Sequence, residues 1–124
     1  MSPVALVVDD SMLIRHTVCR YLEQRGFAVE SATNGMEALD LLKTVLPDVI
    51  ITDLMMPKMD GKELICNLRA NTQTAAIPVV VLAGKSSTED ERSGANFVIF
   101  KDIAIEAQLQ KALVAALGPE ALGN

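Results

Sequence analysis

The segment VIITDLMMPKMDGKEL, residues 49–64, decides the fold, because an apolar run is followed by a short loop and then by a helical pattern. The β-branched residues of Val49–Thr52 are typical of a strand that is buried on both faces of a parallel sheet. Gly61–Ala70 places Leu64, Ile65 and Leu68 at helical spacing. Asp53 directly follows the strand. The segment therefore predicts one strand–loop–helix unit with an acid at the carboxyl end of its strand.

The same alternation of strands and helices extends in both directions from this segment. Gly26 is a suitable stop for the first helix, and Asn34 a suitable cap for the second. The further strands are expected at Val4–Val8, Ala28–Ala32, Val79–Leu82 and Phe97–Phe100, and the further helices at Met12–Arg25, Asn34–Leu46 and Ile103–Leu117. Such alternation predicts an α/β fold with a parallel sheet covered by helices on both faces. Glu120–Asn124 is expected to fray.

The connection between the last two strands breaks this pattern. Residues 85–93 read KSSTEDERS and contain no apolar residue. A helix there would have no face to bury, so we expect a loop or a single frayed turn, and the fourth helix of the fold to be shortened or missing. One face of the last two strands would then be poorly covered. We expect the apolar residues left there to form an interface with a partner protein or in a homodimer.

Composition limits the classes of function. The 124 residues fit a single domain, residues 1–124, and carry a net charge of −5, which argues against direct binding of nucleic acid. We find no secretory signal and no apolar run long enough to span a membrane. Cys19 and Cys66 lack metal-site spacing and are expected to be buried or half-buried free thiols, which suits a cytoplasmic location.

Four charged residues follow three of the predicted strands. Asp9 and Asp10 follow the first strand, Asp53 follows the third, and Lys101 follows the fifth. Parallel strands bring these side chains to one edge of the sheet, where three carboxylates would repel one another unless a cation holds them ionised. Mg²⁺ is the usual ion for such oxygen ligands. With Lys101 as a charge for an anion, the arrangement suits transfer of a phosphoryl group onto an Asp.

The chain resembles the receiver (CheY-like) domain of two-component response regulators. The resemblance rests on VVDDSMLIR, VIITDLMMPKMDGKEL, IPVVVL and SGANFVIFK, and it covers residues 4–117. It implies a doubly wound, five-stranded, flavodoxin-like sheet. It also implies that Asp53 accepts a phosphoryl group from a histidine kinase or phosphotransfer protein. Asp9, Asp10 and the backbone carbonyl of Met55 match the residues that hold Mg²⁺ with Asp53, and Lys101 matches the lysine that contacts the phosphoryl group.

Three positions depart from the pattern of this family. Ala83 stands where the family has a Ser or Thr whose hydroxyl bonds the phosphoryl oxygen. Val98 replaces a frequent Tyr or Phe, and Asp102 replaces the proline after the lysine. We hypothesise that phosphoryl transfer survives while the usual switch does not. A hydroxyl of Ser86 or Ser87, or a water molecule, could take the place of the missing hydroxyl.

The sequence supports two interpretations of function. The leading one is a stand-alone response regulator receiver that signals through protein contacts, and the alternative is a pseudo-receiver that binds proteins without phosphorylation. An Asp-dependent phosphatase would need a second carboxylate two residues after its nucleophile, where this chain has Met55, so we do not expect an enzyme in that sense. We expect Met55 to point toward the mouth of the site, and Met56 and Met59 to have a packing role. His16, the single histidine, is expected at the surface or in helix packing.

Overall fold

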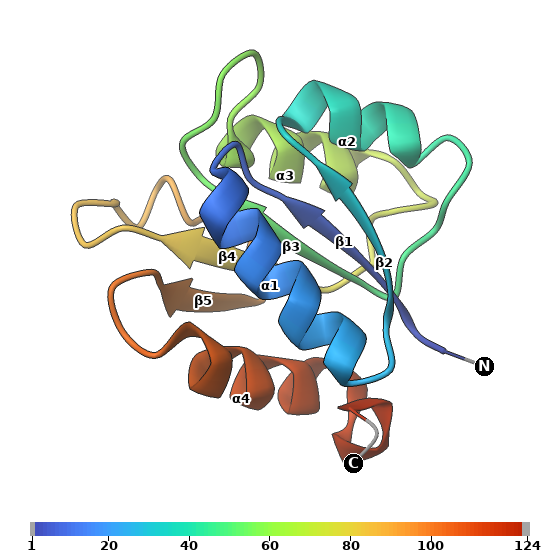
Figure 1. Ribbon diagram of the computed structural model, residues 1–124. Coiled ribbons are helices and arrows are strands. Elements are labelled where there is room, and N and C mark those ends of the chain that lie inside the picture. The colour runs from blue at the N-terminus through green and yellow to red at the C-terminus, as the bar shows by residue number, and fades with distance from the viewer. Residues whose placement is uncertain (1, 123–124) are drawn as a thin grey trace.

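The computed structural model describes residues 2–122, in which a five-stranded parallel sheet has helices on both faces (Figure 1). The strands are β1 (Val4–Val8), β2 (Ala28–Ala32), β3 (Val49–Asp53), β4 (Val79–Ala83) and β5 (Phe97–Phe100). The helices are α1 (Met12–Gln24), α2 (Gly35–Leu41), α3 (Gly61–Ala70), α4 (Ile105–Leu117) and the 3₁₀ helix η1 (Pro119–Leu122). The strand order β2-β1-β3-β4-β5 confirms the predicted doubly wound, flavodoxin-like sheet.

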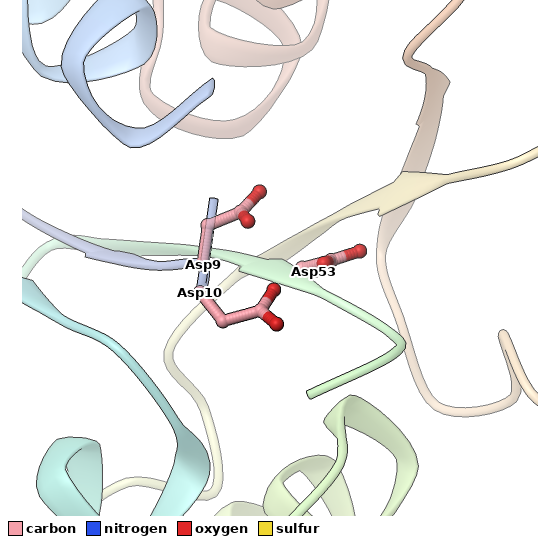
Figure 2. A group of neighbouring side chains, drawn as sticks. All are labelled: Asp9, Asp10 and Asp53. Carbon is pink, nitrogen blue, oxygen red and sulfur yellow. The ribbon is translucent and has the colours of Figure 1, made fainter. Parts of the chain in front are cut away.

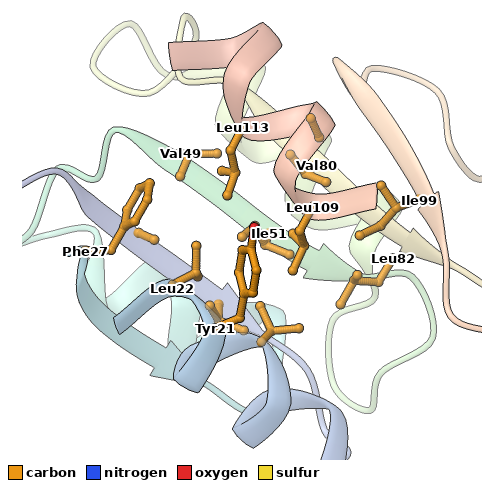
Figure 3. Close-up of a cluster of buried hydrophobic side chains, with 14 of the residues drawn as sticks. Tyr21, Leu22, Phe27, Val49, Ile51, Val80, Leu82, Ile99, Leu109 and Leu113 are labelled. Atoms are coloured by element: carbon orange, nitrogen blue, oxygen red, sulfur yellow. The ribbon is translucent and has the colours of Figure 1, made fainter. Parts of the chain in front are cut away.

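The core lies in two layers, one on each face of the sheet. α1 and α4 cover one face, and α2 and α3 cover the other (Figure 1). Because side chains alternate along a strand, Ile51 and Leu82 pack toward α1 and α4, while Ile50 and Val81 pack toward α2 and α3. Figure 3 shows the first layer, in which Leu109 of α4 lies over the sheet. Both faces of the central strands are therefore buried, which explains their continuous apolar sequences.

The register of the sheet aligns the carboxyl ends of the strands that carry the charged residues. Val8 of β1 pairs with Thr52 of β3. Further along the sheet, Ala83 of β4 pairs with Phe100 of β5. The residues that follow these strands are therefore gathered at one edge of the sheet, as the sequence predicts.

Local signals set most helix boundaries. The Asn34 side chain accepts a hydrogen bond from the Glu37 N–H at 3.0 Å, which confirms the predicted cap of α2. Gly26 adopts a φ of 91°, the left-handed conformation that favours glycine, just after α1. The prediction was wrong for the end of α2, which stops at Leu41 instead of Leu46. There the Thr44 hydroxyl donates to the Leu41 carbonyl oxygen at 3.3 Å, and the chain continues in turns.

The other boundaries differ by one or two residues, apart from the carboxyl-terminal segment. β3 and β4 each extend one residue further than predicted, to Asp53 and Ala83, and α4 begins at Ile105. The predicted fraying of the tail was wrong through Leu122, which is only 7% exposed and packs with the core layer beside α4. Residues 123 and 124 lie outside the described residues.

Residues 84–96 contain turns and no helix, which confirms that the fourth helix of the fold is missing there. The Arg69 side chain of α3 holds the end of this segment. Its guanidinium donates to the Gly94 carbonyl oxygen at 3.1 Å and to Asn96 Oδ1 at 2.7 Å. Asn96 Oδ1 also accepts the Val79 N–H at 2.8 Å, so one side chain joins α3 to the start of β4.

The expectation of a poorly covered face was wrong for β4 but agrees with β5, where Val98 and Phe100 are only half-buried. Every residue of β4 is buried, and β5 is half-buried except for the buried Ile99. The Arg92 guanidinium lies 5.9 Å from the centre of the Phe100 ring, so the segment that replaces the helix still covers part of β5.

Both cysteines are free thiols. Cys19 is half-buried as expected, whereas Cys66 is exposed on α3, so its predicted burial was wrong. His16 is exposed on α1. Within residues 2–122, none of the helices has the length and apolar character needed to cross a bilayer.

Candidate functional site

Three carboxyl groups meet where the strand order reverses, between β1 and β3 (Figure 2). Asp9 and Asp10 follow β1, and Asp53 ends β3. One oxygen from each carboxylate lies within 4.8 Å of the others. Asp9 and Asp53 are buried, and Asp10 is exposed. Open α/β sheets bind their ligands at such a reversal point, beyond the carboxyl ends of the strands.

Asp9 has one satisfied and one unsatisfied carboxylate oxygen. Oδ1 accepts the Ser11 N–H at 2.8 Å. Oδ2 is buried and has no hydrogen-bond partner in the described structure, with the Lys101 ammonium 4.0 Å away. Burial is the main cause that raises the pKa of Asp9 to about 6, and the charge of nearby Asp53 adds to it, although the Ser11 N–H acts in the opposite direction.

This donor set fits a hard divalent cation. It offers oxygen atoms only, and an unpartnered buried carboxylate oxygen would gain a ligand. The residues in position to hold such an ion are Asp9, Asp10 and Asp53.

Asp53 is paired with the ammonium group of Lys101. Its Oδ1 accepts the Leu54 N–H at 2.8 Å and lies 2.7 Å from the Lys101 ammonium. Lys101 is held at the end of β5 because its backbone N–H donates to the Ala83 carbonyl oxygen at 3.1 Å. The structure thus brings together all four charged residues that the sequence predicted.

The loop between β3 and α3 depends on a close approach at Gly61. A Cβ atom at Gly61 would collide with the Asp53 carbonyl oxygen and would lie 2.9 Å from the Leu54 Cα. The Gly61 N–H donates to the Leu54 carbonyl oxygen at 2.8 Å. Glycine is needed here because no side chain fits against the backbone of Asp53 and Leu54.

The methionines of this loop take the packed and exposed positions that the sequence predicted. Met56 and Met59 pack against the core layer beneath α2 and α3. Met55 is 71% exposed and lines the cavity above Asp53.

A cavity of about 220 Å³ lies above Asp53. It is lined by Met55 and Lys101 and by three residues of the segment after β4, Ser86, Ser87 and Glu91. The Ser87 hydroxyl donates to the Gly84 carbonyl oxygen at 2.8 Å. The sequence prediction missed Glu91. The pattern Thr88-x-x-Glu91 was the available signal, because such spacing is typical of reciprocal hydrogen bonding at a turn or helix start.

The three altered positions have different surroundings. Ala83 is fully buried and packs in the core layer of α2 and α3, and it is not part of the cavity wall. Val98 is half-buried on β5. The Asp102 carboxylate forms an ion pair with Lys85 at 3.1 Å, which joins the loop after β4 to the loop after β5.

Exposed apolar side chains occur in the loops and helix start at this edge of the sheet. Met12 and Leu13 at the start of α1 are 75% and 72% exposed, and Ile103 in the loop after β5 is 59% exposed. A hollow of about 470 Å³, lined by Lys101, Ile103 and Thr17 of α1, lies between these two segments. The helical pattern of Met12–Arg25 in the sequence gives no sign of this exposed surface.

Comparisons with known proteins agree on one family. The family model of the response regulator receiver domain matches residues 5–113. The response regulator MprA of Mycobacterium bovis is 35% identical over an alignment of 126 positions, which covers 97% of this chain and 54% of MprA. The chain therefore spans about half the length of the curated relatives it matches.

Solved structures extend the similarity to the fold. The chemotaxis response regulator CheY4 of Vibrio cholerae has a TM-score of 0.85 and 32% identity, with 94% of this chain and 100% of that chain covered. The receiver domain of a histidine kinase from Syntrophus aciditrophicus has a TM-score of 0.87 and 31% identity, with 99% and 96% covered. The receiver domain of sensor histidine kinase PA1611 from Pseudomonas aeruginosa, which holds a magnesium ion in its active-site cleft, shares the fold at a TM-score of 0.86 and 22% identity, with 95% and 99% covered.

Proposed function

This chain belongs to the response regulator receiver family, and on that premise we propose that Asp53 accepts a phosphoryl group from a histidine kinase or a phosphotransfer protein. The observation that carries the proposal is the buried Asp53 carboxylate, 2.7 Å from the Lys101 ammonium and beside Asp9 and Asp10. A carboxylate oxygen of Asp53 attacks the phosphorus atom of phosphohistidine. A phosphorus–oxygen bond forms, the phosphorus–nitrogen bond breaks, and the imidazole leaves.

Lys101 and the acids have distinct roles in this proposal. The Lys101 ammonium lies beside the acceptor oxygen and stabilises the negative charge of the phosphoryl group. Asp9, Asp10, Asp53 and the backbone carbonyl of Met55 would hold Mg²⁺, which would neutralise charge on the transferring phosphoryl group. The unpartnered Oδ2 of Asp9 supports this assignment.

The phosphodonor protein docks on the exposed apolar side chains at the same edge of the sheet as Asp53. Met12, Leu13 and Ile103 are exposed at the same edge of the sheet as Asp53, and Ile103 lines the hollow beside Lys101. Apolar side chains around a polar site are typical of a protein contact. We place this reaction in the cytoplasm, and the protein acts there as a signalling domain that catalyses only its own phosphorylation and dephosphorylation.

A pseudo-receiver is the second candidate, and the buried Ala83 favours it. No hydroxyl group occurs at this position to bond a phosphoryl oxygen, and a hydrogen bond to a charged group contributes about 1.5–3 kcal/mol. In this alternative the protein binds its partners without phosphorylation of Asp53.

The deciding experiment is intact-protein mass measurement after incubation with Mg²⁺ and acetyl phosphate. The proposal expects one phosphoryl adduct on the wild-type protein and none on Asp53→Asn. A phosphorylated histidine phosphotransfer protein serves as the second donor. Absence of an adduct with both donors, while the protein remains folded, would establish the pseudo-receiver.

The downstream contact is proposed at β5, either with a partner protein or in a homodimer. Phe97 and Val98 line a groove of about 260 Å³ beside α4 together with Lys111. Light scattering of Val98→Lys tests the homodimer: a lower mass than that of the wild-type protein supports it, and equal masses contradict it.

A further inference from the structure

The segment that replaces the fourth helix places a second acid in the wall of the Asp53 cavity. Among the described residues that line this cavity, Asp53 and Glu91 are acidic and Lys101 is positively charged. Lys101 is already paired with Asp53 at 2.7 Å. Within residues 2–122, no lysine or arginine forms an ion pair with Glu91. Glu91 is therefore a half-buried carboxylate without a cationic partner, and it lines the same cavity as the proposed phosphoryl acceptor.

Glu91 is held in place by its own turn. The Thr88 N–H donates to Glu91 Oε1 at 2.8 Å, and the Glu91 N–H donates to Thr88 Oγ1 at 3.1 Å. This reciprocal arrangement is typical of the first turn of a helix, although only turns follow here.

The residues on either side of Glu91 anchor the same turn to the domain. Asp90 forms an ion pair with Lys62 of α3. The guanidinium of Arg92 donates to the Thr88 carbonyl oxygen at 3.1 Å and lies over the Phe100 ring. The turn thus has fixed contacts with both α3 and β5.

The bond from Thr88 leaves Glu91 with free capacity to accept hydrogen bonds. An ionised carboxylate has about four acceptor positions, and one protein donor is bound to this one. A water molecule in the cavity could donate to Glu91 while its oxygen faces the phosphoryl group on Asp53.

We propose that Glu91 is the general base that hydrolyses the phosphoryl group on Asp53, and this inference rests on the function proposed above. The water oxygen attacks phosphorus as its proton passes to the Glu91 carboxylate. A new phosphorus–oxygen bond forms and the bond to Asp53 breaks, which restores the Asp53 carboxylate. The proton then passes from Glu91 to the departing inorganic phosphate. The lifetime of the signal is set by the segment that replaces the helix.

The test compares four proteins, all phosphorylated with acetyl phosphate and Mg²⁺ and then separated from the donor. The first-order loss of the adduct is followed by intact mass for the wild type, Glu91→Gln, Glu91→Asp and Glu89→Gln. Glu91→Gln keeps an oxygen that can accept the Thr88 N–H but removes the base. Glu91→Asp keeps the charge but withdraws the carboxylate by one methylene group. Glu89→Gln makes the same change of charge in the same turn at a residue outside the cavity wall.

We expect Glu91→Gln to slow the loss of the adduct by about tenfold or more, and Glu91→Asp to slow it measurably. Glu89→Gln should match the wild type. If Glu91→Gln decays at the wild-type rate, or Glu89→Gln slows equally, Glu91 is not the base. If only Glu91→Gln slows while Glu91→Asp matches the wild type, Glu91 acts by repelling the phosphoryl group, and the inference is also overturned.

The same samples separate this inference from the proposed function. If the wild type forms an adduct and Glu91→Gln does not stabilise it, only the role of Glu91 fails. If neither the wild type nor any variant forms an adduct, the proposed phosphorylation itself fails, and the role of Glu91 fails with it. Thermal unfolding of each variant checks that the comparison is made between folded proteins.

Discussion

Asp9 is a buried carboxyl group whose Oδ2 has no hydrogen-bond partner among the described residues. Its raised pKa, about 6 against an ordinary 3.8, means that the folded protein binds a proton there more tightly than the unfolded chain does. Between pH 4 and 6 the folded state therefore holds more protons, so the contribution of Asp9 to stability falls as the pH rises. At the residue scale, the site is destabilising for the protein until a cation occupies it.

Asp9→Asn should remove this pH dependence. In the absence of Mg²⁺ at pH 7, we expect the variant to be more stable than the wild type by up to about 3 kcal/mol, because ionisation of the buried carboxyl group is avoided. The difference in the free energy of unfolding should shrink as the pH falls from 6 to 4. Added Mg²⁺ should stabilise the wild type and have little effect on Asp9→Asn. Urea unfolding at several pH values, with and without Mg²⁺, measures the stability difference, its pH dependence and the effect of Mg²⁺. A stability difference that does not change with pH would contradict the argument.

Gly61 allows α3 to begin directly against the backbone of Asp53. Gly61→Ala should destabilise the protein by about 1–3 kcal/mol and slow phosphoryl uptake, because the new Cβ atom displaces the Asp53 carbonyl oxygen. Gly84→Ala is the control for stability alone, since a Cβ atom there has no neighbour within 4 Å but Gly84 itself lines the Asp53 cavity. Chemical denaturation and adduct formation measure the two effects. Equal stability of the two alanine variants would show that the close approach does not matter.

At the scale of elements, α3 organises the segments that a fourth helix would otherwise hold. The Arg69 guanidinium donates to the Ala75 and Ile77 carbonyl oxygens at 3.0 and 2.8 Å, before β4. It also donates to the Gly94 carbonyl oxygen and to Asn96, before β5. One side chain thus fixes two connections that contain little secondary structure.

Arg69→Ala should therefore destabilise the protein by about 2–4 kcal/mol, since hydrogen bonds from a charged donor are among the stronger ones. Hydrogen exchange should increase most at the amides of residues 94–96, which the guanidinium fixes. Arg20→Ala, an exposed position on α1, is the control. If exchange rises evenly over the whole protein instead, the effect of Arg69 is global and not confined to these connections.

In the whole molecule, the fold brings exposed apolar side chains from separate segments to the edge of the sheet that carries Asp53. Met12 and Leu13 come from the start of α1, and Ile103 comes from the loop after β5. Leu46 is similarly exposed but lies before β3, toward the amino ends of the strands. Met12, Leu13 and Ile103 thus form the proposed docking surface, and Leu46 is an exposed apolar residue away from that surface that serves as a control.

The double substitution Leu13→Ser with Ile103→Ser should slow phosphoryl uptake from a phosphotransfer protein by about tenfold or more, through loss of apolar contact. Uptake from acetyl phosphate should not change, because the reacting groups are untouched. Leu46→Ser should match the wild type with both donors. A parallel loss with acetyl phosphate would show that the substitutions damage the site and not the contact.

The sheet, the strand positions and the four charged residues of the site could be predicted from the sequence. Strands buried on both faces need continuous apolar runs, and residues after parallel strands must share an edge. The absence of a helix in KSSTEDERS was also predictable, since a segment without apolar residues has no face to bury.

Only the tertiary structure decided which polar groups meet and which apolar groups are covered. The position of Glu91 in the cavity wall depends on contacts with α3 and β5, which are distant in sequence. The burial of Leu122 depends on the core layer beside α4, and the coverage of β5 depends on Arg92. Such contacts are set by packing between distant segments, and local patterns in a sequence carry no information about the space that remains between them.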